Sequence, residues 1–170
     1  MDHKRVAFTG IVVVCNEEER LRECLESLSF CSELLVINLE SKDRSVEIAQ
    51  DCGARVLNHE RVPTAGIARK YGSKHAKNDW IVFLDPDEVF PSVLYPEMCR
   101  LIHEDRKLGR IFVPWKFYFK GEPLKGTRWG GKKHKGHVVN RSRCFIGPPE
   151  NKYAHQEVSL KEGFGHARVS

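Results

Sequence analysis

The 170-residue sequence has no apolar run that approaches the roughly 20 residues needed to span a bilayer, which argues against a transmembrane chain. Its first residues, MDHKRV, also lack the apolar core of a secretory signal peptide. Both absences predict an intracellular, cytoplasmic location. With 41% hydrophobic and 30% charged residues, the composition is typical of a soluble globular protein. We expect one domain that covers residues 1–170.

Several nucleotide- and metal-binding motifs are also missing. The sequence contains neither the GxGxxG dinucleotide fingerprint nor the GxxxxGK[ST] phosphate loop. A bound phosphate would therefore need a metal ion and side chains to offset its charge, and Arg69 is the best candidate. The cysteines form no CxxC pair and no zinc spacing with histidine. We expect reduced and mostly buried thiols, with a catalytic Cys15 as the alternative.

The most informative stretch runs from Trp80 to Glu88, where five apolar residues lead directly into Asp85, Asp87 and Glu88. Such a run is typical of a strand covered on both faces in a parallel sheet, and these sheets bind ligands at the carboxyl ends of their strands. Like charges this close repel one another, so the cluster predicts a divalent cation with oxygen ligands, of the kind that also holds phosphates. A solvated acidic turn shaped by Pro86 is the alternative.

The first ninety residues are predicted to alternate between strand and helix. The expected strands cover residues 9–15, 34–39, 55–57 and 80–84. Asn16 and Glu19 have the spacing of a capping box, Asp43 is the expected cap of a second helix, and a third helix is expected at 65–76. This order predicts a parallel, doubly wound sheet. Beyond Pro91 we expect one helix at 92–107 and then β-rich sequence.

Two strands are expected in that β-rich part, at residues 111–119 and 138–146. Charge differs between the halves: residues 1–90 hold 12 Lys+Arg and 16 Asp+Glu, a net charge of −4, whereas residues 91–170 hold 16 and 7, a net charge of +9. The basic excess is concentrated in residues 116–143. This segment is predicted to bind an anionic acceptor, to dock on an anionic membrane face, or to be solvated surface.

Three segments in fixed order resemble family 2 glycosyltransferases of the GT-A fold. They read IVVVCNEEERLRECLESL, SKDRSVEIAQDCGARV and GIARKYGSKHAKNDWIVFLDPDE. The bacterial branch that adds sugars to the lipopolysaccharide core is the one they look most like. The resemblance is strong over 9–90 and weak near AHQEV at 154–158. It implies a nucleotide-sugar-binding half at 1–90, a mostly parallel sheet, and a β-rich acceptor-binding half at 91–170.

The resemblance implies an inverting transfer from a nucleoside-diphosphate sugar, most commonly a UDP-sugar, to a hydroxyl of a glycan or glycolipid. Cys15, Asn16 and Glu17 would border the base and ribose, and Glu40 stands near them at the end of the second strand. Arg69 would approach the diphosphate or the base.

Asp85 and Asp87 match the DxD-type motif, which implies Mn²⁺ or Mg²⁺ as the cofactor. Asp87 is the expected direct ligand. His155 matches a position suited to the metal or to the acceptor side. Glu88 or Glu157 would be the general base, which removes the acceptor proton.

The sequence departs from the family pattern at three positions. Asn38 replaces the usual Asp, Glu40 replaces Gly, and Gln156, which cannot act as a general base, replaces the HE glutamate. A catalytically weakened sugar-nucleotide-binding protein is therefore an alternative. Another is a nucleic-acid-binding protein that uses the basic segment, with Trp129, Trp115 and Phe117 as stacking groups. The acidic amino-terminal half argues against nucleic acid as a partner.

Overall fold

The computed structural model describes residues 5–125, 130–131, 133–147 and 158–169. The strands are β1 (Phe8–Val14), β2 (Glu33–Asn38), β3 (Arg55–Asn58), β4 (Trp80–Leu84), β5 (Leu108–Trp115), β6 (Tyr118–Phe119), β7 (Glu122–Pro123), β8 (Lys133–Asn140), β9 (Cys144–Ile146), β10 (Val158–Leu160) and β11 (Gly165–Arg168). The helices are α1 (Leu21–Ser27), α2 (Ser45–Asp51), α3 (Ala65–His75), the short 3₁₀ helix η1 (Ser92–Leu94) and α4 (Tyr95–Glu104).

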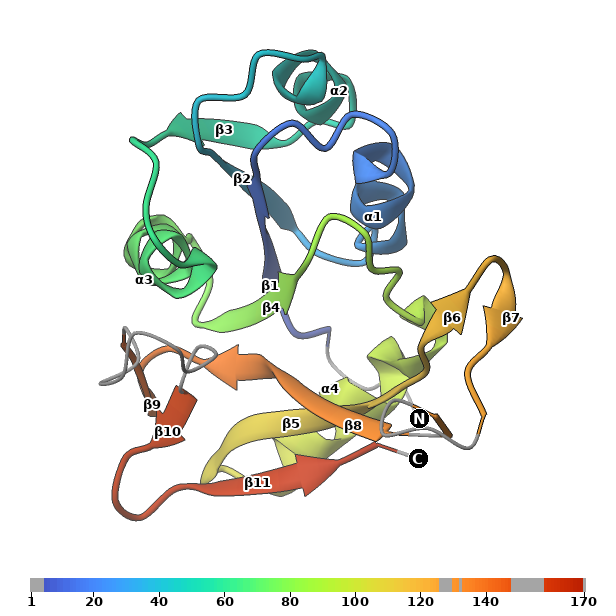
Figure 1. Ribbon diagram of the computed structural model, residues 1–170. Coiled ribbons are helices and arrows are strands. Elements are labelled where there is room, and N and C mark those ends of the chain that lie inside the picture. Colours follow the sequence, from blue (N-terminus) through green and yellow to red (C-terminus); the bar gives the residue numbers. More distant parts are fainter. Residues whose placement is uncertain (1–4, 126–129, 132, 148–157, 170) are drawn as a thin grey trace.

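Seven strands form one sheet in the order β11-β5-β8-β4-β1-β2-β3 (Figure 1). Strands β3, β2, β1 and β4 are parallel, as expected for the amino-terminal half. Strand β8 then pairs antiparallel to both β4 and β5, and β11 lies parallel to β5. The expected α/β class, with a mostly parallel sheet and a β-rich carboxyl half, is therefore confirmed.

Helices cover both faces of the parallel strands, with α1 and α2 on one face and α3 on the other (Figure 1). Successive residues of a strand point to opposite faces, so Val12 and Val14 of β1 enter one apolar core while Ile11 and Val13 enter the other. Gly72 allows α3 to approach the sheet closely, because a Cβ atom at this position would lie 3.1 Å from Ile11 Cγ2.

The carboxyl half differs from the expected element boundaries. The helix expected at 92–107 is divided into η1 and α4, and α4 ends at Glu104. The strand expected at 138–146 is wrong, because Asn140 Oδ1 accepts hydrogen bonds from the Ser142 N–H (3.1 Å) and hydroxyl (2.6 Å) and the chain turns there. Strand β9 follows this turn and pairs with β10 in a separate two-stranded sheet.

A second two-stranded sheet, the β6–β7 hairpin, projects from the end of β5 (Figure 1). Its strands are joined by Lys120 and Gly121, which have φ values of 50° and 82°. Two successive left-handed residues are typical of a tight type I′ hairpin turn. The strand expected at 111–119 therefore corresponds to β5 and β6, with an interruption after Trp115.

Candidate active site

The carboxyl ends of β1 and β4 form the edge at which the predicted polar residues gather. Strand β1 lies between β2 and β4, so the chain connections run in opposite directions from it. In open α/β sheets, ligands bind in the crevice at such a switch point. Because Val12 of β1 pairs with Leu84 of β4, the segments Cys15–Glu17 and Asp85–Glu88 leave the sheet next to one another.

Hydrogen bonds tie the loop after β1 to the loop after β2. The Asn16 N–H donates to Ser41 Oγ (3.1 Å), and the Lys42 N–H donates to Asn16 Oδ1 (2.7 Å). Asn16 has φ 62°, a left-handed conformation that asparagine adopts more readily than most residues. The expected capping box at Asn16 is therefore wrong, since its side chain holds the neighbouring loop and α1 begins only at Leu21.

Asp43 strengthens the same connection. One carboxylate oxygen accepts the N–H (3.0 Å) and hydroxyl (2.6 Å) of Ser45, the first residue of α2, and the other accepts the Glu18 N–H (3.0 Å). Ser45 Oγ in turn accepts the Glu17 N–H (2.9 Å). Asp43 thus serves the start of α2, as expected, and also fixes the position of Glu17.

The two residues of this segment that depart from the family pattern, Asn38 and Glu40, lie at and just after the end of β2. Asn38 is buried, its Nδ2 donates to Asn58 Oδ1 (2.9 Å), and its Oδ1 accepts the Ser41 N–H (3.0 Å). Glu40 is exposed, has φ 55°, and lies 4.0 Å from Arg61. A glycine adopts that backbone conformation more easily. An open hollow of about 510 Å³ lies beside Asn38 and Glu40.

Arg69 and Asp85 form an ion pair, so the structure brings these two predicted residues together. The Arg69 side chain, from α3, is only 10% exposed, and its guanidinium lies 5.8 Å from the centroid of the Phe83 ring. The Cys24 thiol of α1 donates to the Asp85 carbonyl (3.3 Å). Asp85 is therefore held from both faces of the sheet, while its carboxylate stays partly accessible.

Glu88 is also held in place. Its Oε2 accepts the Asp85 N–H (3.1 Å), its Oε1 forms an ion pair with Lys135 of β8, and its side chain is 10% exposed. Burial raises the pKa of Glu88, although the hydrogen bond from Lys135 opposes this. The Lys135 ammonium lies 4.6 Å from the Trp115 ring centroid and 5.1 Å from that of Phe117. These aromatic faces add cation–π attraction to the ion pair.

His137 lies two residues beyond Lys135 on β8. Its ring stacks on Trp115, with centroids 5.6 Å apart and an interplanar angle of 11°. Its Nδ1 lies 3.0 Å from the Phe83 carbonyl, which can only accept, so Nδ1 carries the proton. Burial, together with the charges of Arg69 and Lys135, lowers the pKa of His137 to about 4. The imidazole is therefore neutral at pH 7.

The edge carries a surplus of negative charge. The pKa of Glu17 is raised, first by burial and then by Asp87, Asp43 and Asp85. These carboxylate oxygens are the donors that Mn²⁺ and Mg²⁺ prefer, so the donor set fits such an ion. Among the described residues, no three His, Cys, Asp or Glu side chains converge to hold a metal ion by themselves. An ion at Asp87 would need further oxygen ligands, such as those of a diphosphate.

A cleft of about 750 Å³ opens beside this acidic loop. It lies between the start of α1, the loop after β4, and the segment from the end of β5 into β6. Its lining residues are Arg20, Glu23, Asp87, Glu88, Val89, Pro91, Pro114, Trp115, Lys116, Phe117 and Tyr118. The candidate metal ligand Asp87 and the candidate base Glu88 therefore face a cleft whose opposite wall belongs to the carboxyl half.

Some predicted residues lie outside the described part of the chain: His155, Gln156, Glu157 and Trp129. Conversely, sequence reasoning missed Lys135 and His137. Lys135 was one of nine basic residues in 116–143, and nothing in the sequence singled it out. Strand β8 reads KHKGHVVN, without alternation of polar and apolar residues, so the local sequence carried no signal for either residue.

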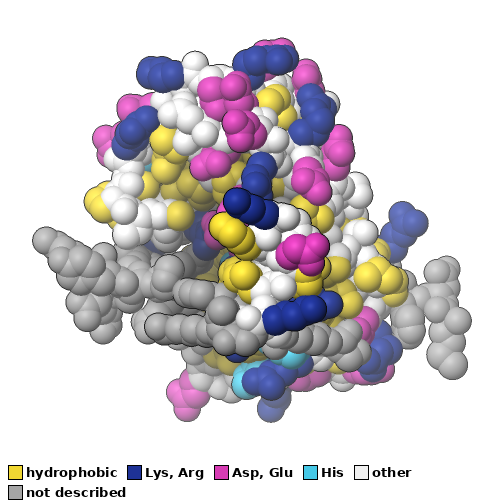
Figure 2. Space-filling view, turned by 45° about the vertical axis from the view of Figure 1, so that its right-hand side comes forward, with side chains coloured by type: hydrophobic (Ala, Val, Ile, Leu, Met, Phe, Trp, Pro, Cys, Tyr) yellow, Lys and Arg dark blue, Asp and Glu magenta, His cyan; other side chains and the backbone are white. Residues whose placement is uncertain are grey.

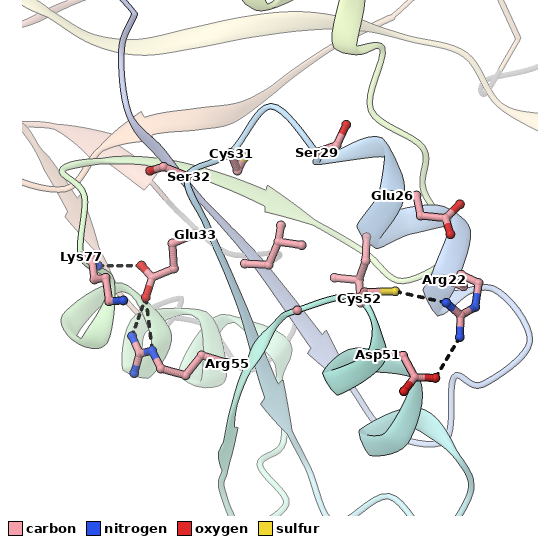
Figure 3. Close-up of a pocket in the computed structure, with 13 residues that line it drawn as sticks. Arg22, Glu26, Ser29, Cys31, Ser32, Glu33, Asp51, Cys52, Arg55 and Lys77 are labelled. Atoms are coloured by element: carbon pink, nitrogen blue, oxygen red, sulfur yellow. Dashed lines mark hydrogen bonds and ion pairs between the residues drawn. The ribbon is translucent and has the colours of Figure 1, made fainter.

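A second hollow, of about 490 Å³, lies near the amino-terminal ends of β2 and β3 (Figure 3). Its most buried charge, Glu33, accepts hydrogen bonds from Arg55 (2.7 Å), the Lys77 N–H (2.7 Å) and the Thr9 hydroxyl (2.8 Å). Burial would raise the pKa of Glu33, but these hydrogen bonds outweigh it and lower the pKa. This carboxylate is therefore satisfied within the fold, and the hollow is remote from the acidic loop.

The fold and this edge define an α/β protein with an acidic, metal-compatible site at a switch point of its sheet. The family model described as "Glycosyl transferase family 2" matches residues 9–158. The chain belongs to glycosyl transferase family 2, as the sequence motifs predicted.

Two relatives illustrate the range of similar proteins. The "Uncharacterized glycosyltransferase YibD" of Escherichia coli (strain K12) is 30% identical over 154 residues, which cover 85% of this chain and 45% of the relative. The "4,4'-diaponeurosporenoate glycosyltransferase" of Staphylococcus haemolyticus is 35% identical over 90 residues, which cover 48% and 24%. This chain therefore spans less than half the length of either protein.

Solved structures show the same fold. S. aureus TarS 1-349 in complex with UDP has a TM-score of 0.57 at 20% identity, over 71% of this chain and 38% of TarS. Glucosyl-3-phosphoglycerate synthase from Mycobacterium tuberculosis, in complex with Mn²⁺, UDP and glucosyl-3-phosphoglycerate, has a TM-score of 0.54 at 22% identity, over 68% of this chain and 45% of that enzyme. The GT-A architecture expected from the sequence is confirmed.

Within the described residues, none of the helices combines the length and apolar character needed to cross a membrane.

Proposed function

We propose that this chain transfers a sugar from a UDP-sugar to a hydroxyl of an anionic glycan or glycolipid, with inversion at the anomeric carbon and with a divalent metal ion. The observation that carries the proposal is the acidic loop Asp85–Glu88 at the β1/β4 switch point, with Arg69 paired to its first carboxylate. Family membership and the UDP and Mn²⁺ in two proteins of the same fold support this choice of donor and cofactor.

The donor would lie across the carboxyl edge of the parallel strands. Cys15, Asn16 and Glu17 would border the base and ribose, and the hollow beside Glu40 offers further room for the base. Buried Arg69 would contribute positive charge under the diphosphate while it orients Asp85. These assignments follow the family pattern. The hydrogen bonds between the two loops would hold the residues that border the donor in fixed positions.

Asp87 is the proposed direct ligand of Mn²⁺ or Mg²⁺, and Asp85 would contribute from the partly exposed side of its carboxylate. His155 is a further candidate ligand from the carboxyl half. When bound, the ion would offset the negative charge that develops on the departing diphosphate. The surplus of carboxylates around Glu17 supports a cation at this place: burial raises the pKa of Glu17 most, and the charges of Asp87, Asp43 and Asp85 raise it further.

In the proposed reaction an acceptor hydroxyl oxygen forms a bond to the anomeric carbon. The bond from that carbon to the diphosphate oxygen breaks, and UDP leaves with the electron pair. The hydroxyl proton passes to a carboxylate, for which Glu88 and Glu157 are the candidates. Glu88 lines the cleft, and the raised pKa of its carboxyl group suits a general base.

The acceptor would enter the cleft of about 750 Å³ from the side of Lys116, Phe117 and Tyr118. The basic excess of this half favours an anionic acceptor, since complementary charge concentrates such a molecule at the site. Synthesis of cell-envelope polysaccharide or lipopolysaccharide, at the cytoplasmic side of the membrane, is the pathway that fits this acceptor class and the sequence resemblance.

Calorimetric titration with UDP, GDP, ADP and CMP, each with and without Mn²⁺, tests the donor site. We expect Mn²⁺-dependent binding of UDP that Asp87→Ala weakens at least tenfold, because one metal ligand is lost. Asp79→Ala is the matched control, since this exposed aspartate lies before β4 at the opposite end of the strand. Equal UDP affinity in both variants, or no nucleotide binding by the unmodified protein, would contradict the proposal.

A further inference from the structure

Most of the large apolar side chains that are exposed among the described residues line the cleft or follow its lining residues closely in the sequence. Five large hydrophobic residues are exposed, and four of them are Val89, Val93, Tyr118 and Phe119, at 51%, 80%, 61% and 65% exposure. Val89 and Tyr118 line the rim of the cleft. Phe119 follows Tyr118 in the hairpin, and Val93 lies two residues after Pro91, which also lines the cleft. We call these four residues the rim patch.

The hairpin gives the rim patch an unusual shape. Tyr118 and Phe119 are adjacent on β6, so they point to opposite faces of a ribbon that has only two strands. Both are nevertheless exposed, because the hairpin projects from the body of the protein (Figure 1). The turn at Lys120 and Gly121 places a cation at its tip. An isolated two-stranded ribbon gains little from its own packing, so these rings are available to an external partner.

Positive charge accompanies the apolar side chains. Lys116, Lys120 and Lys125 are exposed on the hairpin and its flanks, against one acid, Glu122. The Lys120 ammonium lies 5.7 Å from the centroid of the Phe119 ring. Figure 2, which brings this side of the molecule forward, shows hydrophobic and Lys/Arg side chains next to one another in the middle of the face. Acidic side chains are more frequent in its upper part, over the amino-terminal half.

We propose that the rim patch and the hairpin lysines dock the protein on an anionic lipid surface, so that the cleft opens toward the membrane. Exposed aromatic residues insert at the level of the headgroups, while lysines next to them attract anionic lipids. A soluble polyanion would require the lysines but not the apolar side chains around them. The proposal deepens the proposed function by placing a lipid-linked acceptor at the mouth of the cleft, but vesicle docking itself does not depend on the identity of the donor.

Co-sedimentation with vesicles of phosphatidylcholine, alone or with about one third phosphatidylglycerol, tests the docking. We expect binding to the anionic vesicles only, and a steep loss of binding as salt rises, because salt screens charges beyond about 10 Å at 0.1 M. The variants avoid residues that line the cleft. Val93→Ser with Phe119→Ser should weaken vesicle binding at least tenfold, whereas Phe145→Ser, at an exposed apolar residue outside the rim patch, should not.

The charge contribution is tested in the same way. Lys120→Gln with Lys125→Gln should weaken binding about 25-fold, since each lysine near an anionic surface contributes about fivefold. The control pair is Lys74→Gln with Lys77→Gln, which are exposed at the far end of α3 and beyond it. UDP titration of every variant separates docking from donor binding, because a fault in the donor site would change UDP affinity and leave vesicle binding intact.

Two results would overturn the proposal. One is the absence of binding to anionic vesicles by a protein that binds UDP. The other is a concentration-dependent dimer, seen by light scattering, that disappears in Val93→Ser with Phe119→Ser while vesicle binding is unchanged. That second result would assign the rim patch to a second copy of the chain.

Discussion

Lys135 illustrates how one side chain from the carboxyl half shapes the acidic loop. It pairs with Glu88 and lies against the faces of Trp115 and Phe117. Glu88 in turn accepts the Asp85 N–H, so the position of Asp85 depends on a residue of β8. A buried carboxylate is stable only when it is paired, and Lys135 supplies the partner.

His137 leads to a prediction about pH. Its folded pKa of about 4 lies below the ordinary value of 6.5, so the unfolded chain takes up the proton first as pH falls. The stability that depends on a neutral His137 is present above pH 6.5 and is lost between pH 6.5 and about 4. The loss amounts to up to about 3 kcal/mol, at 1.4 kcal/mol per pKa unit.

Urea unfolding at a series of pH values measures this effect. His137→Asn should flatten the decrease, because asparagine offers a donor to the Phe83 carbonyl but does not titrate. His75→Asn, at an exposed histidine of α3, is the control and should keep the slope of the unmodified protein. If His137→Asn retains that slope as well, other groups cause the acid sensitivity.

The placement of helix α3 against the sheet depends on Gly72, which has no Cβ atom. A Cβ at Gly72 would approach Ile11 Cγ2 at 3.1 Å and Ile37 Cδ1 at 3.2 Å. Because α3 also carries Arg69, its distance from the sheet determines where the guanidinium meets Asp85. The close packing at Gly72 therefore links the core to the candidate site.

Gly72→Val should lower the free energy of unfolding by about 1–3 kcal/mol, because the extra methyl groups overpack the space between α3 and the sheet. Lys74→Val is the control in the same helix, where the side chain is exposed and only helix propensity changes, by roughly 0.5 kcal/mol. Chemical denaturation of both variants gives the comparison. Equal losses would show that α3 does not pack tightly at Gly72.

The amino-terminal elements were predictable because each has a local signal. Trp80–Leu84 is an unbroken apolar run, and Gly53, at φ 74°, ends α2 as a helix-terminating glycine should. The capping box predicted at Asn16 is wrong although the spacing to Glu19 satisfies the pattern. The side-chain oxygen of Asn16 instead accepts the N–H of Lys42, which lies 26 residues away in the next loop. The turn at Asn140 was missed for a similar reason, since apolar residues continue on both sides of it.

The candidate site was only partly predictable, because a local pattern reports only residues that lie close together in the sequence. Asp85, Asp87 and Arg69 belong to motifs that lie within one short segment. Lys135 reaches Glu88 across 47 residues, and no local pattern reports an antiparallel strand that returns to the sheet from so far away.

The whole molecule is joined through the sheet. Strand β8 continues the hydrogen bonding from β4, and one apolar core contains Phe8 and Trp80 from the amino-terminal half together with Leu108 and Val138 from the carboxyl half. The two halves differ in charge and in proposed ligand, but they share a core. We therefore expect them to fold as one unit.

A fragment of residues 5–90 should lack a cooperative thermal transition, because it leaves the β4 edge unpaired and exposes apolar surface. The full chain should unfold in one transition by circular dichroism. Mixing the fragment with residues 91–170 is the control, and a recovered transition would show that the missing partner strands are the cause. A cooperative transition of fragment 5–90 alone would instead define two domains.

The loop from Asp85 to Glu88 is held by the thiol of Cys24, the guanidinium of Arg69 and the ammonium of Lys135, which come from α1, α3 and β8. The two halves of the chain are therefore not freely exchangeable. A replacement of residues 91–170 would keep Glu88 paired only if the incoming strand carried a cation in register with it.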